Sequence, residues 1–311
     1  MKQKWMNSVT VQGYIFSHTL QNRTSKKGVP YISGIIRVAT DESASNVVDV
    51  HFGYVTETFG KSGKSNQSYS VLQNIIDNSK TWEMFGEGST KVRISGNVDV
   101  NDFYNREGEL VSAKRVSGSF VHVIDNMPNG GFVGFNVDMI ISGCVERERD
   151  DMPSYLDLRG YVFNFRNDIL PITLSVHEQS GIDYFLGQDI SNNNPMVTNV
   201  RGEIISTTIV QETEIEGAFG APQVRTSTRE FRAWDVTWAA PEPQEWDDES
   251  TITKKELKQA LADREVYLAE QKQRQEEYRN NKNGSQSFDS TVEKAPAPIA
   301  EPDDDDVEFE F

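Results

Sequence analysis

Short apolar stretches that alternate with polar residues run from Val9 to Ile124. Clusters of Gly, Asn and Ser separate them, a pattern typical of β-strands joined by turns. The predicted strands cover residues 9–16, 31–39, 47–55, 91–100 and 109–124. A helix is predicted at 67–77, where apolar residues recur at helical spacing. Three strands, a helix and a hairpin give the element order of a five-stranded Greek-key OB barrel.

The same order of elements then recurs. Residues 135–146 restart the pattern of the first strand, and we place Gly143 at the position of Gly13. The predicted elements that follow are strands at 155–165, 170–176, 197–210 and 226–238, with a short helix at 182–186. We therefore expect a second OB barrel in tandem with the first.

The composition changes after Ala240. Residues 241–245 are rich in Pro and Glu, and Thr253 with Glu256 forms a capping box that predicts the start of a polar helix. Ser, Gln and Pro dominate the segment that follows the helix, which predicts disorder. The expected fold is mainly β, with four segments: a first barrel at 1–134, a second at 135–240, a linker and polar helix at 241–283, and a disordered acidic tail at 284–311.

Charge is distributed unevenly along the chain. The net charge is −17, but residues 1–134 hold 14 Lys and Arg against 12 Asp and Glu, which makes the first predicted barrel slightly basic. A strongly acidic protein is not a general electrostatic binder of polyanions, because such binding needs cations that face the phosphates. A local basic surface on the first barrel is compatible with these numbers.

Several classes of protein are disfavoured by the sequence. A single cysteine and four scattered histidines predict no metal site and no internal disulfide. We find no motif for a catalytic nucleophile or a phosphate loop, so we expect neither an enzyme nor a cofactor. No apolar run is long enough to cross a bilayer, and the N-terminus lacks an apolar signal core, so we expect a cytoplasmic protein.

The outer face of the first barrel combines rings with cations. A single nucleic-acid strand is held by aromatic side chains that stack on bases and by cations along the backbone path. The rings expected to stack on bases are Tyr14, Phe16, Tyr31, Phe103 and Tyr104. The cations expected to meet phosphates are Arg23, Lys26, Lys27, Arg37, Lys61, Lys64 and Arg106.

Exposed rings on strands can also be ordinary packing residues, since strands are enriched in Tyr and Phe. The repeat helps to separate the two interpretations. In the register that we infer, the second barrel carries Cys144 and Glu146 at the positions of Tyr14 and Phe16. Neither residue can stack on a base, so we expect the first barrel to bind nucleic acid and the second to have another role.

The C-terminus ends in an acidic run that contains apolar side chains. Aromatic residues at the end of a disordered acidic segment have no core to serve, and they suit capture by an apolar pocket with a basic rim. The residues expected to bind a partner protein are Asp303, Asp304, Asp305, Asp306, Val307, Phe309 and Phe311.

Two OB barrels and an arm that ends in Asp303 to Asp306 and Phe311 resemble single-stranded DNA-binding proteins, most closely those of tailed bacteriophages. The resemblance implies a non-catalytic protein that coats single-stranded DNA in replication or recombination. It also implies that the acidic tip recruits replication or recombination proteins, and it allows a homo-oligomer. If a phage encodes the protein, we expect it in the host cytoplasm. The alternative is a virion structural or assembly protein that uses its barrels as interaction modules.

Overall fold

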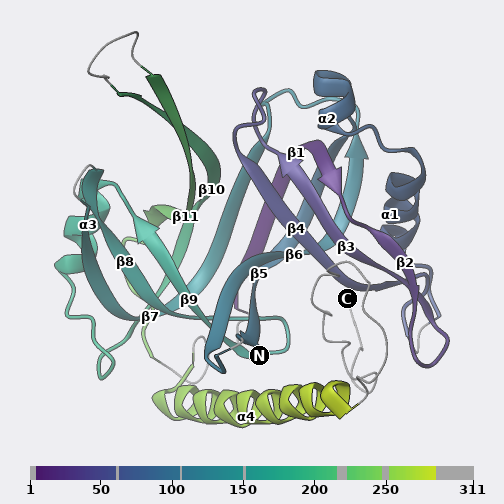
Figure 1. Ribbon diagram of the computed structural model, residues 1–311. Coiled ribbons are helices and arrows are strands. Elements are labelled where there is room, and N and C mark those ends of the chain that lie inside the picture. Colours follow the sequence, from purple (N-terminus) through teal and green to yellow (C-terminus); the bar gives the residue numbers. More distant parts are fainter. Residues whose placement is uncertain are drawn as a thin grey trace.

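The computed structural model describes residues 5–60, 63–105, 107–149, 152–215, 223–246 and 252–284. The fold is mainly β, as the alternating pattern predicted. Figure 1 shows two neighbouring groups of strands with a long helix beneath both of them. Within the described residues, no helix has the length and apolar character that crossing a bilayer would require.

The first barrel is closed by a circuit of strand pairs. β1 pairs with β5, β5 with β6, β6 with β4 in parallel, β4 with β3, and β3 with β1 again. This circuit is the strand order of an OB barrel, and the short β2 extends β3 at the edge. The strands are β1 (Asn7–His18), β2 (Gln21–Thr24), β3 (Pro30–Ala39), β4 (Val47–Thr56), β5 (Lys91–Tyr104) and β6 (Leu110–Ile124).

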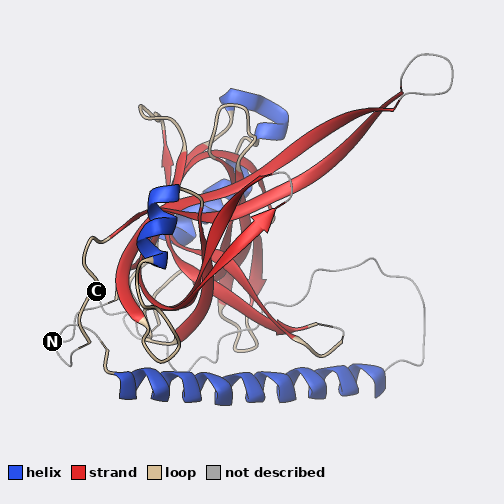
Figure 2. Cartoon of the chain, turned by 90° about the vertical axis from the view of Figure 1, so that its left-hand side faces the viewer, coloured by secondary structure: helices blue, strands red, loops and turns tan. Residues whose placement is uncertain are grey.

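The second barrel repeats the circuit. β7 pairs with β8, β8 with β9, β9 with β11 in parallel, β11 with β10, and β10 with β7. The hairpin of β10 and β11 extends well beyond the barrel, as Figure 2 shows. The strands are β7 (Phe132–Arg149), β8 (Met152–Phe163), β9 (Ile169–Val176), β10 (Met196–Ile215) and β11 (Gln223–Ala239).

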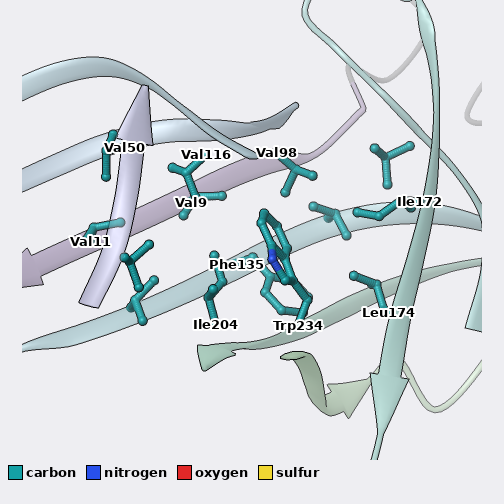
Figure 3. Packing of buried hydrophobic residues seen from close by; sticks show 14 of the residues in the cluster. Val9, Val11, Val50, Val98, Val116, Phe135, Ile172, Leu174, Ile204 and Trp234 are labelled. Atoms are coloured by element: carbon teal, nitrogen blue, oxygen red, sulfur yellow. The ribbon is translucent and has the colours of Figure 1, made fainter. Parts of the chain in front are cut away.

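The two barrels share one sheet and one core. β1 and β7 pair antiparallel from Asn7 opposite Val137 to Gln12 opposite Phe132, so the sheet is continuous between the barrels. One hydrophobic cluster contains Val9 and Val116 of the first barrel with Phe135 and Trp234 of the second (Figure 3). The division of the chain into domains at 1–134, 135–240, 241–283 and 284–311 stays our proposal.

The strand pairings correct the register of the internal repeat. Ile15 pairs with Val38 before a bulge, and Ile141 pairs with Gly160 before a bulge, so Ile15 and Ile141 occupy equivalent positions. Phe16 therefore corresponds to Ser142, and the expected match of Gly143 to Gly13 is wrong. The bulge obscures this register in the sequence, because it adds one residue to the alternation.

Only a glycine fits where β1 crosses β3 in the first barrel and where β7 crosses β8 in the second. The glycine can lie on either of the two crossing strands. A Cβ on Gly13 would lie 2.0 Å from the Ala39 carbonyl oxygen on β3, while a Cβ on Gly160 of β8 would lie 2.0 Å from the Ile140 carbonyl oxygen on β7. Gly143 has no such neighbour within 4 Å. The positions of the glycines in the sequence therefore do not reveal the register of the repeat.

Gly13→Ala is expected to destabilise the protein by about 1–3 kcal/mol, since the added methyl group collides with backbone that cannot move independently. Gly53→Ala on β4 is the control, because no atom lies within 4 Å of its added Cβ. Midpoints of urea unfolding would measure both variants. Equal midpoints for the two variants would contradict the crowding at Gly13.

Shorter helices cover the barrels, and a long one joins them. In the first barrel, α1 (Gln67–Asn78) begins at an N-cap in which Asn66 accepts from the Ser68 N–H, and it buries Leu72 and Ile75. The capping box predicted for the long helix is confirmed: Thr253 N–H donates to Glu256 and Glu256 N–H to Thr253. The other helices are α2 (Trp82–Phe85), the 3-10 helix η1 (Gly86–Gly88), α3 (Gln179–Leu186) and α4 (Lys254–Gly284).

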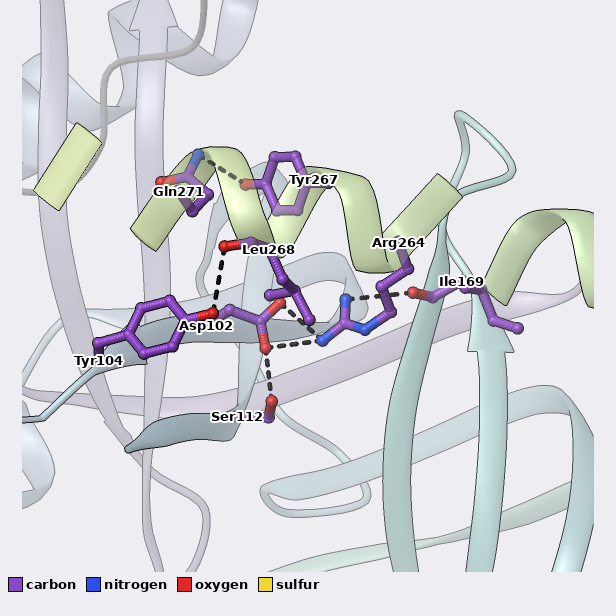
Figure 4. Close-up of polar contacts among 8 residues, drawn as sticks. All are labelled: Asp102, Tyr104, Ser112, Ile169, Arg264, Tyr267, Leu268 and Gln271. Carbon is purple, nitrogen blue, oxygen red and sulfur yellow. Dashed lines mark hydrogen bonds and ion pairs between the residues drawn. The ribbon is translucent and has the colours of Figure 1, made fainter. Parts of the chain in front are cut away.

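Buried contacts hold α4 against both barrels (Figure 4). Nη2 of Arg264 donates to both carboxylate oxygens of Asp102 on β5 at 2.8 Å, in an ion pair, and Nη1 donates to the Ile169 carbonyl of β9. At the start of the helix, Ile252 and Leu257 are buried in a second apolar cluster with residues of the second barrel. The predicted polar helix thus lies along the barrels and connects them.

Candidate nucleic-acid interface

A groove of about 340 Å³ lies between the outer face of the first barrel and the base of the β10–β11 hairpin. We call it the inter-barrel groove. It combines rings with charged side chains from five strands of the two barrels. Those side chains are Phe16, Arg37, Asp49, His51, Lys114, Arg115, Arg232 and Trp234.

Phe16 and Arg37, both expected from the sequence, lie together at this groove. The bulge in β1 falls at Phe16, and the Arg37 guanidinium lies over its ring, 5.2 Å from the ring centre. Nε of Arg37 is 3.3 Å from Oδ1 of Asp49 on β4, in an ion pair whose two side chains are nearly half exposed. This contact engages one of the five guanidinium donors. Phe16 is half-buried and Arg37 is exposed. A ring and a planar cation at one place suit both a base and a phosphate.

The charges on the outer face of the first barrel alternate across the strands. Arg115 on β6 pairs with Asp99 on β5, with 2.6 Å between Nη2 and Oδ2. His51 of β4 lies between the two arginine–aspartate pairs, and burial lowers its pKa, as does the nearby Arg115, against the opposing effect of the aspartates. His51 is therefore neutral at neutral pH, and the arginines carry the positive charge of this face.

The inner end of the groove was not expected from the sequence. Nζ of Lys114 donates to the Thr173 carbonyl of β9 and lies 5.8 Å from the centre of the Trp234 ring. Burial lowers the pKa of Lys114 to about 8, although the charge of Asp157 opposes the shift. Arg232 lines the same end of the groove.

A loop of the first barrel contacts the hairpin beside the groove. Asn46, which follows β3, donates to the Ile204 carbonyl and accepts from the Ser206 N–H of β10. It also bridges to Thr207 through its backbone. These bonds connect the base of the β10–β11 hairpin directly to the first barrel.

One of the rings expected to stack on bases is covered by its own barrel, and a second is partly covered. Tyr31 is only 7% exposed, and its ring centre lies 4.5 Å from that of Tyr54. It cannot offer a face to a base, so this expectation is wrong. Tyr14 is half-buried and packs against Trp82 of α2 at 5.1 Å, with Lys91 nearby.

The hairpin of β5 and β6 also differs from the expectation. The Tyr104 hydroxyl donates to the Leu268 carbonyl of α4, its backbone exchanges hydrogen bonds with Gln275, and Lys272 lies over its ring. Tyr104 therefore anchors α4, and the expectation of an open stacking ring there is wrong. Phe103 points to the other side of the strand and is 41% exposed, so it can still meet a base.

Most of the predicted loop cations lie away from the groove. Arg23 is exposed on β2, and Lys26 and Lys27 are exposed in the turn that Gly28 closes with a φ of +82°. Lys64 is exposed in the loop before α1. Their contact with phosphate stays a prediction. Lys61 and Arg106 lie outside the described residues, as do the C-terminal residues Asp303, Asp304, Asp305, Asp306, Val307, Phe309 and Phe311.

The corrected register shows that the second barrel lacks most of the rings and charges with which the first barrel lines the groove. The pairings of its strands place one residue at each position that carries a ring or a charge in the first barrel. Of six such positions that line the groove, two keep a cation: Arg37 corresponds to Arg159, and Lys114 to Arg232. The other four, Phe16, Asp49, His51 and Arg115, correspond in order to Ser142, Thr173, Ser175 and Ala233. The two barrels therefore still differ in the corrected register, and this difference was the reason to expect nucleic-acid binding by the first barrel.

The family model YorF matches residues 6–274, which include both barrels and most of α4. The chain belongs to the YorF family. Among curated proteins, no match to this YorF-family chain was found.

Solved structures give a distant similarity. The wild-type single-stranded DNA binding protein from Thermus aquaticus is 10% identical, with a TM-score of 0.48 over 79% of this chain and 97% of that one. A deletion mutant of the same protein is 11% identical, with a TM-score of 0.47 over 79% and 98% of the two chains. At this level of similarity, the fold of the YorF-family protein is assigned from its own strand pairings.

No group of three or more His, Cys, Asp or Glu side chains gathers at a place suited to a metal ion in the described part of the YorF-family protein. Cys144, the single cysteine, is partly buried, and burial raises the pKa of its thiol to about 11. A thiol with such a pKa stays protonated and is a poor nucleophile at neutral pH. Cys144 does not line the inter-barrel groove, which presents rings, guanidinium groups, an amine, a carboxylate and an imidazole.

Proposed function

We propose that this protein binds single-stranded DNA without catalysis, and that the strand enters the inter-barrel groove over Phe16 and Arg37. The observation that carries the proposal is the meeting of this ring and guanidinium with three further cations in one groove. Base stacking on an exposed ring contributes about 1–3 kcal/mol per base and needs an unpaired base, because a duplex hides its base faces.

The test is a titration of the full chain with a single-stranded oligonucleotide and with a duplex of the same sequence. Trp234 lines the groove, so its fluorescence should report binding. We expect quenching by the single strand, an affinity that falls as salt rises, and little response to the duplex. Equal affinity for both DNA forms, or no binding of either, would reject the proposed function.

We further propose that a phage encodes this protein and that it acts in replication or recombination. This finer proposal rests on the resemblance of the sequence to single-stranded DNA-binding proteins of tailed bacteriophages. The acidic tip from Asp303 to Phe311 would recruit partner proteins in that process. Deleting residues 303–311 should then preserve or increase DNA affinity while abolishing capture of the replication or recombination partner. A deletion that removes DNA binding instead would assign the tip a different role.

A further inference from the structure

We propose that Lys114 forms a seat for a backbone phosphate at the inner end of the inter-barrel groove, and that binding of a strand takes up a proton at this amine. The inference rests on the proposed function, because it assumes that a nucleic-acid backbone occupies the groove. It adds a residue that the sequence did not indicate, and it couples binding to pH.

The position of Lys114 follows from the strand pairings. It lies on β6 opposite Val100 of β5 and shares a side of the strand with Val116, which is 2% exposed in the core. The lysine is placed beyond that core, where its amine reaches the second barrel at Thr173. The Lys114 side chain therefore leaves β6 on the side of the core of the first barrel and ends in the space between the two barrels.

The internal repeat places a second cation at the same point. Val50 of β4 pairs with Val116, and His51 with Ser117, while Asp235 of β11 pairs with Ser175 of β9. In the corrected register this makes Trp234 equivalent to Val116 and Arg232 equivalent to Lys114. Both cations line the one groove. Equivalent positions of the two barrels thus direct a lysine and an arginine toward a shared space, which suits an anion.

The amine of Lys114 can accommodate a further acceptor. In the described part of the chain its one hydrogen-bond partner is the Thr173 carbonyl, and an ammonium group carries three donors. The Trp234 ring lies near it, but the interaction of a ring with a cation does not replace a hydrogen bond. A phosphate oxygen would supply both the acceptor and the negative charge.

Burial beneath the groove disfavours the charged amine, and its pKa is lowered to about 8, with the charge of Asp157 acting in the opposite direction. A phosphate oxygen beside the amine would favour the charged form and raise that pKa. Above the lowered value, binding must therefore take up a proton, and affinity must fall as pH rises. The other charged or titratable groups that face the groove are Arg37, Asp49, His51, Arg115 and Arg232.

Arginine and aspartate side chains as a class keep their charge between neutral and moderately alkaline pH. His51 has a lowered pKa and is already neutral. Cys144 has its pKa raised to about 11 and stays protonated. The pH dependence of binding in this window therefore reports on Lys114.

The experiment measures the affinity of the full chain for oligo(dC), whose bases do not ionise in this window. For the native protein we expect an affinity about tenfold lower at about pH 9 than at about pH 7.5, because the amine loses most of its charge in that interval. Lys114→Arg should bind with no such loss, since arginine stays charged. Lys114→Met should bind weakly at both pH values.

Lys258→Met on the exposed surface of α4 is the matched control, because it removes one lysine charge away from the groove. It should retain the pH dependence of the native protein. The inference is overturned if Lys114→Arg loses affinity with pH as the native protein does, whether or not Lys114→Met folds. Failure of the native protein to bind oligo(dC) at either pH would instead reject the proposed function, and the inference with it.

Discussion

Asp102→Ala is expected to destabilise the protein by about 3–5 kcal/mol, since removing one partner of a buried ion pair leaves the other charge unpaired. The side chains of Arg264 and Asp102 are only 11% and 8% exposed, and they connect α4 to β5. Arg264 also donates to the Ile169 carbonyl of β9. Without Asp102 the guanidinium would no longer be held in place, and α4 would lose contacts with both barrels. Urea unfolding monitored by circular dichroism would measure the change in stability.

Asp49→Ala provides the matched control for this prediction. It breaks an ion pair of the same residue types, with Arg37, but the two side chains are 46% and 43% exposed. An exposed pair contributes only about 0–1 kcal/mol, because solvent screens both charges. If the two variants lost the same stability, the buried pair beneath α4 would not hold the helix as described.

The double variant Phe16→Ala with Arg37→Met is expected to lower the affinity for single-stranded DNA by about a hundredfold or more. The estimate combines about 1–3 kcal/mol for one lost stacking ring with about 1.5–3 kcal/mol for a lost hydrogen bond between charged groups. Native-like thermal unfolding of the variant would show that the loss belongs to binding. Fluorescence titration with a single-stranded oligonucleotide would measure the affinity.

Phe165→Ala with Arg166→Met is the control for that variant. These residues form the same kind of pair on the second barrel, with the guanidinium 5.4 Å from the centre of an exposed ring, but neither lines the inter-barrel groove. We expect nearly native affinity. A loss as large as that of the groove variant would mean that DNA contacts exposed rings wherever they occur.

The fold could be predicted from the sequence because its signals are local. Alternation within each strand and the repeated element order indicated two OB barrels, and the contacts of Thr253 with Glu256 followed from a spacing of three residues. The register of the repeat could not be predicted from glycines. Gly13 and Gly160 meet the same steric demand from opposite strands of the crossing.

The candidate site could be derived from the sequence only in part, because it depends on how distant segments meet. Alternation assigned Phe16 and Arg37 to the outer face, but it could not show that Tyr31 is covered there or that α4 docks on Tyr104. Lys114 had an inward position in its strand, which usually indicates the core. Only the approach of β9 and β11 turns that position into the end of a groove.

The pairing of β1 with β7 gives the duplication a structural meaning. Val9 of β1 faces Phe135 of β7, and these two residues occupy equivalent positions in their barrels, so the join has approximate twofold symmetry. A solitary copy of the repeat would leave the edge of its first strand bare, and such an edge readily recruits another polypeptide. When two copies are fused, each covers the exposed edge of the other's first strand within a single molecule. The pairing of β1 with β7 then fixes the orientation of the two barrels relative to each other.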